Sequence, residues 1–175
     1  MDLLMMLSDK SIKAIGKRER IIKALEEKSI TFKEIGDVLK ETDEKGAAII
    51  FEAIEAVTNS DAQIAEIEWL KLAVDNILSA SNSIKREASR IVGNISHMFP
   101  DDLGKAIEKL LINSKDTGTV VRWSSAYALS KIILIPQYAN SELYENLTEI
   151  CNCEEESGVK NQYTKALKKA SKLRL

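Results

Sequence analysis

Residues 121–132 read Val-Arg-Trp-Ser-Ser-Ala-Tyr-Ala-Leu-Ser-Lys-Ile, and related patterns recur along the chain. Ile84–Ile95 lies 37 residues earlier, and Val159–Ala170 lies 38 residues later. A looser copy, Gly46–Val57, precedes Ile84 by 38 residues. The closer copies begin with a branched residue and a base, and each has a large aliphatic residue at position nine. Self-similarity at a fixed period predicts a stack of helical hairpins.

The rest of the chain favours helices over strands. Its 175 residues include only two prolines and seven glycines, which is little turn punctuation for a sheet protein. Apolar residues recur at helical spacing. We therefore expect helices near residues 18–28, 31–40, 44–58, 62–79, 83–98, 102–113, 119–134, 141–152 and 158–172, with a further short helix in the first dozen residues.

The twelve-residue pattern resembles the second helix of a HEAT repeat, whose consensus places Val-Arg, Ala-Ala and Ala-Leu-Gly in this order. The Val121 copy matches best and follows a polar turn, Lys115–Gly118. The Gly46 copy departs most, because Ala47 replaces the base. The resemblance covers roughly residues 31–173. It implies an all-α, right-handed α-α superhelix (solenoid) of about four HEAT-like hairpins plus N-terminal helices.

We expect one domain over residues 1–175, with capping helices at 1–30 and repeats at 31–59, 60–98, 101–135 and 139–173. A hairpin of two amphipathic helices cannot bury its apolar stripes alone, whereas stacked hairpins share a continuous core. The family resemblance implies that first helices line the convex side and second helices line the concave side.

Composition indicates a globular protein, with 45% hydrophobic and 30% charged residues. The N-terminus lacks the features of a signal peptide, and no segment is long and apolar enough to span a bilayer. Two closely spaced cysteines, Cys151 and Cys153, form no disulfide framework, so we expect a reduced, cytoplasmic protein. Residues 1–80 carry 11 basic and 16 acidic side chains, and residues 81–175 carry 14 basic and 11 acidic ones. This uneven distribution is compatible with a locally basic face.

Positions three, seven and eleven of each copy are four residues apart and form one row along the helix, opposite the expected core face. In the last three copies this row predicts a basic and aromatic partner-binding patch made of Arg86, Arg90, Trp123, Tyr127, Lys131, Lys165 and Lys169. Two aromatic residues one helical turn apart, Trp123 and Tyr127, are typical of a binding hot spot. The alternative is that they pack between repeats through cation–π contacts with Arg86 and Arg90.

The bases at position two, Lys85, Arg122 and Lys160, have a different interpretation. In HEAT repeats such residues pair with acids in the loops, and the resemblance implies Asp116 as the partner of Arg122. We interpret these three bases as structural.

Catalytic and metal-binding motifs are not found. A lone histidine, His97, cannot form a triad or metal site, and Cys151 and Cys153 lack two further zinc ligands. Phosphate loops and nucleophile elbows are also missing. We therefore expect no catalytic residues, no metal, no cofactor and no enzyme activity.

These features favour a non-enzymatic scaffold or adaptor that holds a protein or peptide segment, with acidic character, on its concave face. One alternative is a nucleic-acid-binding HEAT-like protein related to DNA-repair glycosylases, although the pI of about 5.6 speaks against it. A third alternative, a regulatory or chromophore-handling protein similar to lyase-associated HEAT proteins, rests on analogy of fold. No membrane partner is expected, and the sequence leaves the oligomeric state open.

Overall fold

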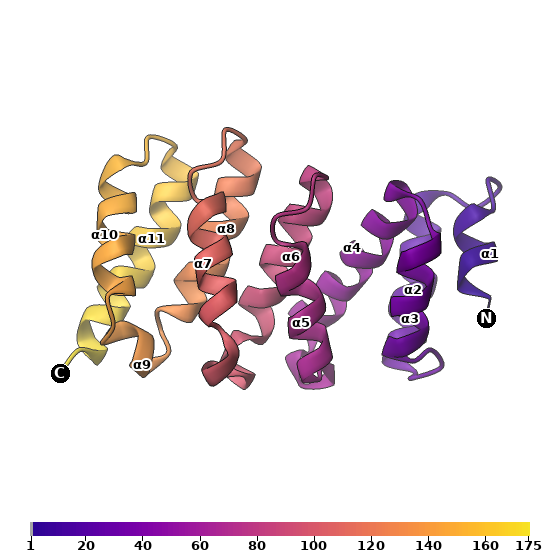
Figure 1. The fold of residues 1–175 in the computed structure, drawn as a ribbon, viewed down its shortest axis with the longest axis horizontal. Helices are drawn as coiled ribbons and strands as arrows, with labels where there is room; N and C mark the ends of the chain where they lie inside the picture. Colours follow the sequence, from indigo (N-terminus) through magenta and orange to yellow (C-terminus); the bar gives the residue numbers. More distant parts are fainter. Residues whose placement is uncertain (1) are drawn as a thin grey trace.

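The structure of the protein is a computed structural model that describes residues 2–175. Over these residues the chain forms helices and turns without a strand. Figure 1 shows the helices as a row of upright pairs, with the two ends of the chain at opposite ends of the row. The predicted all-helical solenoid is confirmed.

Each pair contains a first and a second helix. The first helices are α1 (Leu3–Ser8), α3 (Phe32–Glu41), α5 (Ile67–Asn76), α7 (Gly104–Asn113) and α10 (Leu143–Cys153). The second helices are α2 (Ala14–Glu26), α4 (Glu44–Ser60), α6 (Asn82–Ile95), α8 (Thr119–Ile132) and α11 (Ser157–Ala170). The short elements are α9 (Pro136–Ala139) and the 3-10 turns η1 (Ala62–Ile64), η2 (Ser96–Met98), η3 (Pro100–Asp102) and η4 (Ser171–Leu173).

The second helices form a continuous layer, in which α2 contacts α4, α4 contacts α6, α6 contacts α8, and α8 contacts α11. The four copies of the sequence pattern therefore lie side by side. Small residues make the close contacts possible, because Ser125 and Ala126 on α8 have no exposed surface. A Cβ atom added at Gly93 of α6 would lie 3.0 Å from the Cα atom of Ala128 on α8.

The start of α3 is a capping box formed by Thr31 and Glu34. The Thr31 hydroxyl accepts a 3.2 Å hydrogen bond from the backbone amide of Glu34, and the Glu34 carboxylate accepts one of 2.7 Å from the Thr31 amide. These reciprocal bonds satisfy two amides that the helix leaves unpaired.

The predicted helix over residues 62–79 is wrong, because the chain forms η1 first and begins α5 only at Ile67. Asp61 accepts a 3.0 Å hydrogen bond from the Gln63 amide, and Ala65 is extended, so a tight turn forms in place of the first helical turns. Trp69 of α5 then stacks on Phe32 of α3, with ring centroids 4.9 Å apart. Its indole is buried and joins two successive first helices.

Candidate functional site

A groove of about 580 Å³ lies along the layer of second helices. We call it the α4–α8 groove. Its charged lining comes from Arg18 on α2, Glu52 and Glu55 on α4, and Arg86, Glu87 and Arg90 on α6. The remaining wall is the first turns of α8, where Val120 and Trp123 face the groove. The groove therefore combines three arginines and three glutamates with an apolar edge.

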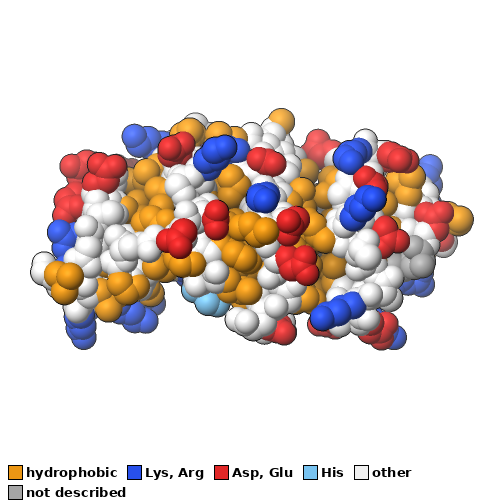
Figure 2. All heavy atoms as spheres, turned by 60° about the horizontal axis from the view of Figure 1, so that its bottom comes forward, with side chains coloured by type: hydrophobic (Ala, Val, Ile, Leu, Met, Phe, Trp, Pro, Cys, Tyr) orange, Lys and Arg blue, Asp and Glu red, His pale blue; other side chains and the backbone are white. Residues whose placement is uncertain are grey.

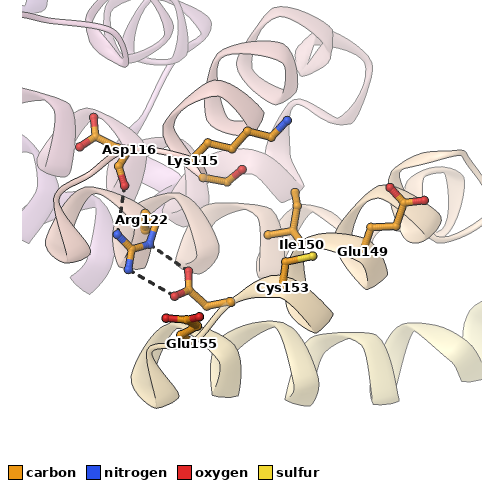
Figure 3. A pocket seen from close by; sticks show the side chains of 9 residues that line it. Lys115, Asp116, Arg122, Glu149, Ile150, Cys153 and Glu155 are labelled. Atoms are coloured by element: carbon orange, nitrogen blue, oxygen red, sulfur yellow. Dashed lines mark hydrogen bonds and ion pairs between the residues drawn. The ribbon is translucent and has the colours of Figure 1, made fainter.

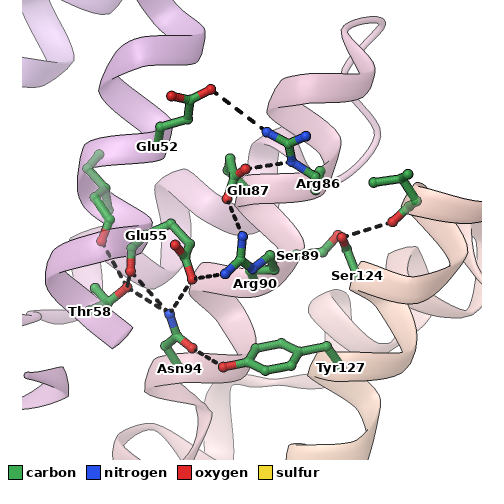
Figure 4. A network of polar contacts seen from close by, with 12 residues as sticks. Glu52, Glu55, Thr58, Arg86, Glu87, Ser89, Arg90, Asn94, Ser124 and Tyr127 are labelled. Carbon is green, nitrogen blue, oxygen red and sulfur yellow. Dashed lines mark hydrogen bonds and ion pairs between the residues drawn. The ribbon is translucent and has the colours of Figure 1, made fainter. Parts of the chain in front are cut away.

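Arg86 and Arg90, two of the predicted binding residues, are held in ion pairs (Figure 4). Arg86 contacts Glu87 at 2.6 Å and Glu52 at 3.8 Å. Arg90 contacts Glu55 at 2.8 Å and Glu87 at 3.3 Å. Both Glu55 and Glu87 are buried. Because buried charges require partners, the main role of these two arginines is to neutralise Glu55 and Glu87.

Glu55 is the most perturbed carboxylate of the groove. Burial raises the pKa of Glu55 above its ordinary value, the nearby Arg90 opposes this effect, and the like charge of Glu87 adds to it. The groove thus holds one carboxylate that is easier to protonate than a free glutamate.

Asn94 connects three second helices beneath the groove. Its amide nitrogen lies 3.3 Å from the Glu55 carbonyl oxygen and 3.2 Å from the Thr58 hydroxyl on α4. Its Oδ1 accepts a 2.6 Å hydrogen bond from the Tyr127 hydroxyl on α8. The sequence placed Asn94 in the exposed row, but its side chain is buried because α4 and α8 both contact α6 at this level.

Three residues of the predicted patch form one stack on α8. The rings of Trp123 and Tyr127 are 5.7 Å apart and nearly parallel, at 17°. The Lys131 ammonium lies 4.7 Å from the centre of the Tyr127 ring. Both aromatic residues are half-buried, and Trp123 packs against the core. Within residues 2–175, the cation–π contact to Tyr127 thus comes from Lys131 and not from the arginines of α6.

The last two predicted residues, Lys165 and Lys169, are exposed on α11. In the described part of the chain, their ammonium groups form no hydrogen bond or ion pair with the α8 stack or with the arginines of α6. The structure therefore brings together the α6 and α8 members of the patch and leaves the α11 members apart. A binding role for all seven residues stays a prediction.

Only Arg86, Arg90 and Trp123 of the groove lining were predicted as binding residues, and Val120 and Arg18 are among those that sequence reasoning missed. Val120, which is 57% exposed, immediately precedes the repeated pattern and could have been noticed as an extra apolar residue there. Arg18 lies on α2, outside the recognised repeats, so periodicity gave no signal for it. Over residues 2–175, Arg18 is the guanidinium of this groove that has no carboxylate within ion-pair distance.

A second groove, of about 500 Å³, lies between successive loops on the same stack (Figure 3). The Arg122 guanidinium contacts the Glu154 carboxylate at 3.0 and 3.3 Å, and it also donates a 3.0 Å hydrogen bond to the Asp116 carbonyl oxygen. The Asp116 carboxylate pairs with Lys85 at 2.9 Å. The implied pairing of Arg122 with the Asp116 side chain is therefore wrong. The Asp116 carboxylate binds Lys85 of the preceding hairpin, and Arg122 binds the Glu154 carboxylate of the following one.

These loop carboxylates are held in the ionised form. The backbone amide of Gly118 and the ammonium of Lys85 lower the pKa of Asp116 below its ordinary value. Burial would raise the pKa of Glu154, but hydrogen bonds from Arg122 and from the Glu156 amide outweigh it, and the pKa is lowered. The two ion pairs therefore persist at neutral pH.

The surface shows no large area of a single charge in the view of Figure 2, where acidic, basic and apolar side chains alternate along the long face of the molecule. Among residues 2–175, no helix is long and apolar enough to cross a membrane.

No protein-family profile matches the chain. No curated protein sequence matches it either. Among solved structures, the chain is similar to one in the complex of CpcE and CpcF of phycocyanin lyase from Nostoc sp. PCC7120. The two chains are 19% identical over 94% of this chain and 95% of the other, with a TM-score of 0.67. An engineered protein is 16% identical over 98% and 96% of the chains, with a TM-score of 0.49. The likeness to the chain of the phycocyanin lyase complex supports a helical solenoid, and at 19% identity it shows the fold alone.

The prediction that the chain is not an enzyme is overturned by this comparison. It rested on missing catalytic motifs and on the solenoid architecture, yet a chain with this fold belongs to a phycocyanin lyase complex. A solenoid fold is therefore no argument against participation in catalysis. The alternative of a relative of DNA-repair glycosylases gains no support from the similar structures.

Proposed function

We propose that this chain is a protein-binding subunit that holds a segment of a partner protein in the α4–α8 groove. The observation that carries the proposal is Val120, an apolar side chain that remains 57% exposed at the edge of a preformed groove. Val120 and Trp123 are three residues apart on α8, so they share one face of the helix. Tryptophan is enriched among the residues that contribute most to protein–protein binding, so Trp123 beside the exposed Val120 supports a role in partner binding.

The charges of the groove support a partner segment of a particular kind. Arg86 and Arg90 are occupied by glutamates, which leaves Arg18 as the guanidinium available to a ligand. A segment with an apolar side chain for Val120 and Trp123, followed by a carboxylate for Arg18, fits this arrangement. The remaining predicted residues on α8, Tyr127 and Lys131, would position Trp123, because all three form one stack.

The test uses two exposed apolar residues that differ in location. Val120→Ser changes the groove, and Ile112→Ser changes a residue on α7 that is 59% exposed and outside the lining of the groove. Binding of the partner that co-purifies with the wild-type chain is measured by biolayer interferometry. We expect Val120→Ser to weaken binding about tenfold, which corresponds to about 1.4 kcal/mol, and Ile112→Ser to leave it unchanged. Equal affinities for Val120→Ser and wild type would contradict the proposal.

We also propose that the hairpins are HEAT repeats over residues 31–59, 60–98, 101–135 and 139–173, preceded by capping helices at residues 1–30. The 37–38-residue spacing of the pattern and the contacts between successive second helices support this assignment. The two cysteines are free, which supports a reducing compartment such as the cytoplasm.

A second candidate function is a subunit of a lyase. The observation that favours it is coverage, because the similarity extends over 95% of a chain that belongs to a phycocyanin lyase complex. The chain would then act together with a second protein, as CpcE and CpcF form a complex. The measurement is phycocyanin lyase activity of the chain with its co-purified partner. Activity that depends on both proteins supports this function, and a confirmed pair without activity contradicts it.

A further inference from the structure

On α6 and α8, one row of residues faces the next second helix. It consists of positions two, six and ten of the repeated pattern. On α6, the members at positions six and ten are Ser89 and Gly93, both of which are buried, and Gly93 lies against α8. On α8, the corresponding residues are Ala126 and Ser130, which are also buried. We call this row the stacking row, and on α6 and α8 its small residues at positions six and ten allow the next hairpin to approach.

The base at position two of the stacking row makes two kinds of contact, and Arg122 makes both. Arg122 donates to the carbonyl oxygen of Asp116, which is six residues earlier in its own loop. It also pairs with the carboxylate of Glu154 in the loop of the next hairpin. Lys85 makes the equivalent carboxylate contact with Asp116, again in the next loop. The α6–α8 and α8–α11 junctions are thus each closed by a base from one hairpin and an acid from the following one.

Lys160 on α11 makes only the first of these contacts. Its ammonium lies 3.3 Å from the carbonyl oxygen of Glu154, six residues earlier, as Arg122 does with Asp116. Within residues 2–175 it has no carboxylate within ion-pair distance, and its side chain is exposed. Lys160 is therefore held in the position of a stacking base, and its ammonium has no carboxylate partner among residues 2–175.

The remainder of the stacking row on α11 is open and basic. Thr164, Lys168 and Lys172 continue the row and are exposed. Residues 157–175 contain six basic side chains and no acidic one. The end of the chain does not cover this row, because Arg174 bonds to the Ala139 carbonyl oxygen of α9 and Leu175 donates its amide to Asn140.

We propose that this face of α11 is an interface for a different helical-hairpin protein, whose loop carboxylate completes the ion pair at Lys160. The occupant is acidic because a carboxylate is the group that the two internal junctions use and because the lysine row repels a basic surface. A second copy stacked head to tail is disfavoured, since residues 2–20, at the other end of the stack, contain five basic and three acidic side chains. This interface is separate from the α4–α8 groove.

The first experiment uses a carbodiimide, which joins an amine directly to a carboxylate that it contacts. The tagged chain is treated with the carbodiimide in a lysate of its source cells and purified, and the joined peptides are sequenced by mass spectrometry. The proposal expects Lys160 to be joined to an aspartate or glutamate between two helices of another protein. Links from Lys160 only to Glu154 or Glu156 of its own chain, or to Asp9 of a second copy, would overturn it.

The second experiment measures affinity for the protein found in this way, with purified components. We expect Lys160→Gln to weaken binding at least tenfold, Lys160→Arg to retain it, and Lys105→Gln, an exposed lysine of α7, to leave it unchanged. An unchanged affinity for Lys160→Gln would overturn the proposal. Val120→Ser separates the two surfaces, because it should weaken binding in the groove and leave the cross-link at Lys160 intact.

Discussion

The Tyr127 hydroxyl on α8 donates a 2.6 Å hydrogen bond to the Oδ1 of Asn94 on α6. Asn94 donates in turn to Glu55 and Thr58 on α4, so one buried amide connects three successive hairpins. Only 4% of Asn94 is exposed, and water cannot readily replace a lost partner. This contact assigns Tyr127 a structural role in addition to its place beside Trp123.

We predict that Tyr127→Phe lowers the free energy of unfolding by about 1 kcal/mol, because the Asn94 oxygen loses its donor. Tyr163→Phe is the matched control. The buried Tyr163 hydroxyl has no hydrogen-bond partner among the residues that the structure describes, and burial raises the pKa of this residue. Removing that hydroxyl should leave stability unchanged or increase it. Urea unfolding followed by circular dichroism measures both, and equal losses in the two variants would contradict the assignment.

The contact between α6 and α8 depends on the absence of a side chain at Gly93. A Cβ atom there would lie 3.0 Å from both the Ala128 backbone and the Tyr127 ring. We predict that Gly93→Ala destabilises the protein by about 1–3 kcal/mol through overpacking. The control is Gly36→Ala on α3, where nothing lies within 4 Å. This change should stabilise the helix by about 0.5–1 kcal/mol, so thermal unfolding should show opposite shifts.

The ion pair between Arg122 and Glu154 closes the last junction of the stack. Their side chains are 18% and 6% exposed. Arg122→Gln leaves a buried carboxylate without its partner, and we predict a loss of about 3 kcal/mol. Arg174→Gln removes a more exposed pair with Glu145 and should cost less than about 1 kcal/mol. The double variant Arg122→Gln/Glu154→Gln should recover part of the loss. Similar losses for the two single variants would contradict the prediction.

Stability should fall at acidic pH in a way that depends on Asp116. The pKa of Asp116 in the folded protein is lowered below 3.8, chiefly by the Gly118 amide and by Lys85. A lowered pKa contributes stability that is fully present above the unfolded pKa and is lost as pH falls through the folded pKa. Asp116→Asn should therefore reduce the difference in stability between pH 6 and pH 3. Urea unfolding at both values tests this, and an unaltered difference would contradict it.

Glu55 should have the opposite effect on the pH dependence of stability. Its pKa is raised above 4.5 by burial, so the folded state takes up a proton before the unfolded state does as pH falls. Relative stability then increases as pH falls through the raised pKa towards 4.5. The Glu55→Gln variant should lose this increase, which the same unfolding experiments measure between pH 7 and pH 4.5. A persistent increase in the variant would assign it to another group.

Lys28 follows the C-terminus of α2 with a φ of 52°, in the left-handed region. The amides of Lys28 and Ser29 bond back to carbonyl oxygens of α2, as in a helix-terminating turn that favours glycine. We predict that Lys28→Gly stabilises the protein by about 0.5–1 kcal/mol, because glycine adopts this conformation without strain. Thermal unfolding measures the gain, and Lys23→Gly within α2 should instead reduce stability.

The architecture could be predicted from the sequence because the period places equivalent residues on equivalent helices. Ser125 and Ala126 are small for a reason that the pattern reveals, namely the close approach of the next helix. The break before Ile67 was not predictable from apolar spacing, since the spacing continues through a turn that local hydrogen bonding fixes.

The ion pairing of the groove residues was harder to predict than the architecture. The row containing Arg86 and Arg90 was identified, but their neutralisation depends on Glu55 and Glu87 at other positions of the pattern. Which acid reaches which base is determined by the register between neighbouring helices, and one sequence does not encode this register in any simple spacing. For the same reason Asn94 was expected to be exposed, whereas contacts from both neighbours bury it.

The serial contacts of the second helices also determine how the molecule comes apart. Within residues 2–175, the main contacts between second helices join each one to the second helix before it and the one after it, so this layer supports α2 and α11 on one side each. Opening at either end leaves the ion pairs around Glu55 and Arg90 undisturbed. Amide hydrogens should therefore exchange fastest in the outer helices and slowest in α6. The middle of the groove can stay folded while the helices at the ends of the stack open transiently.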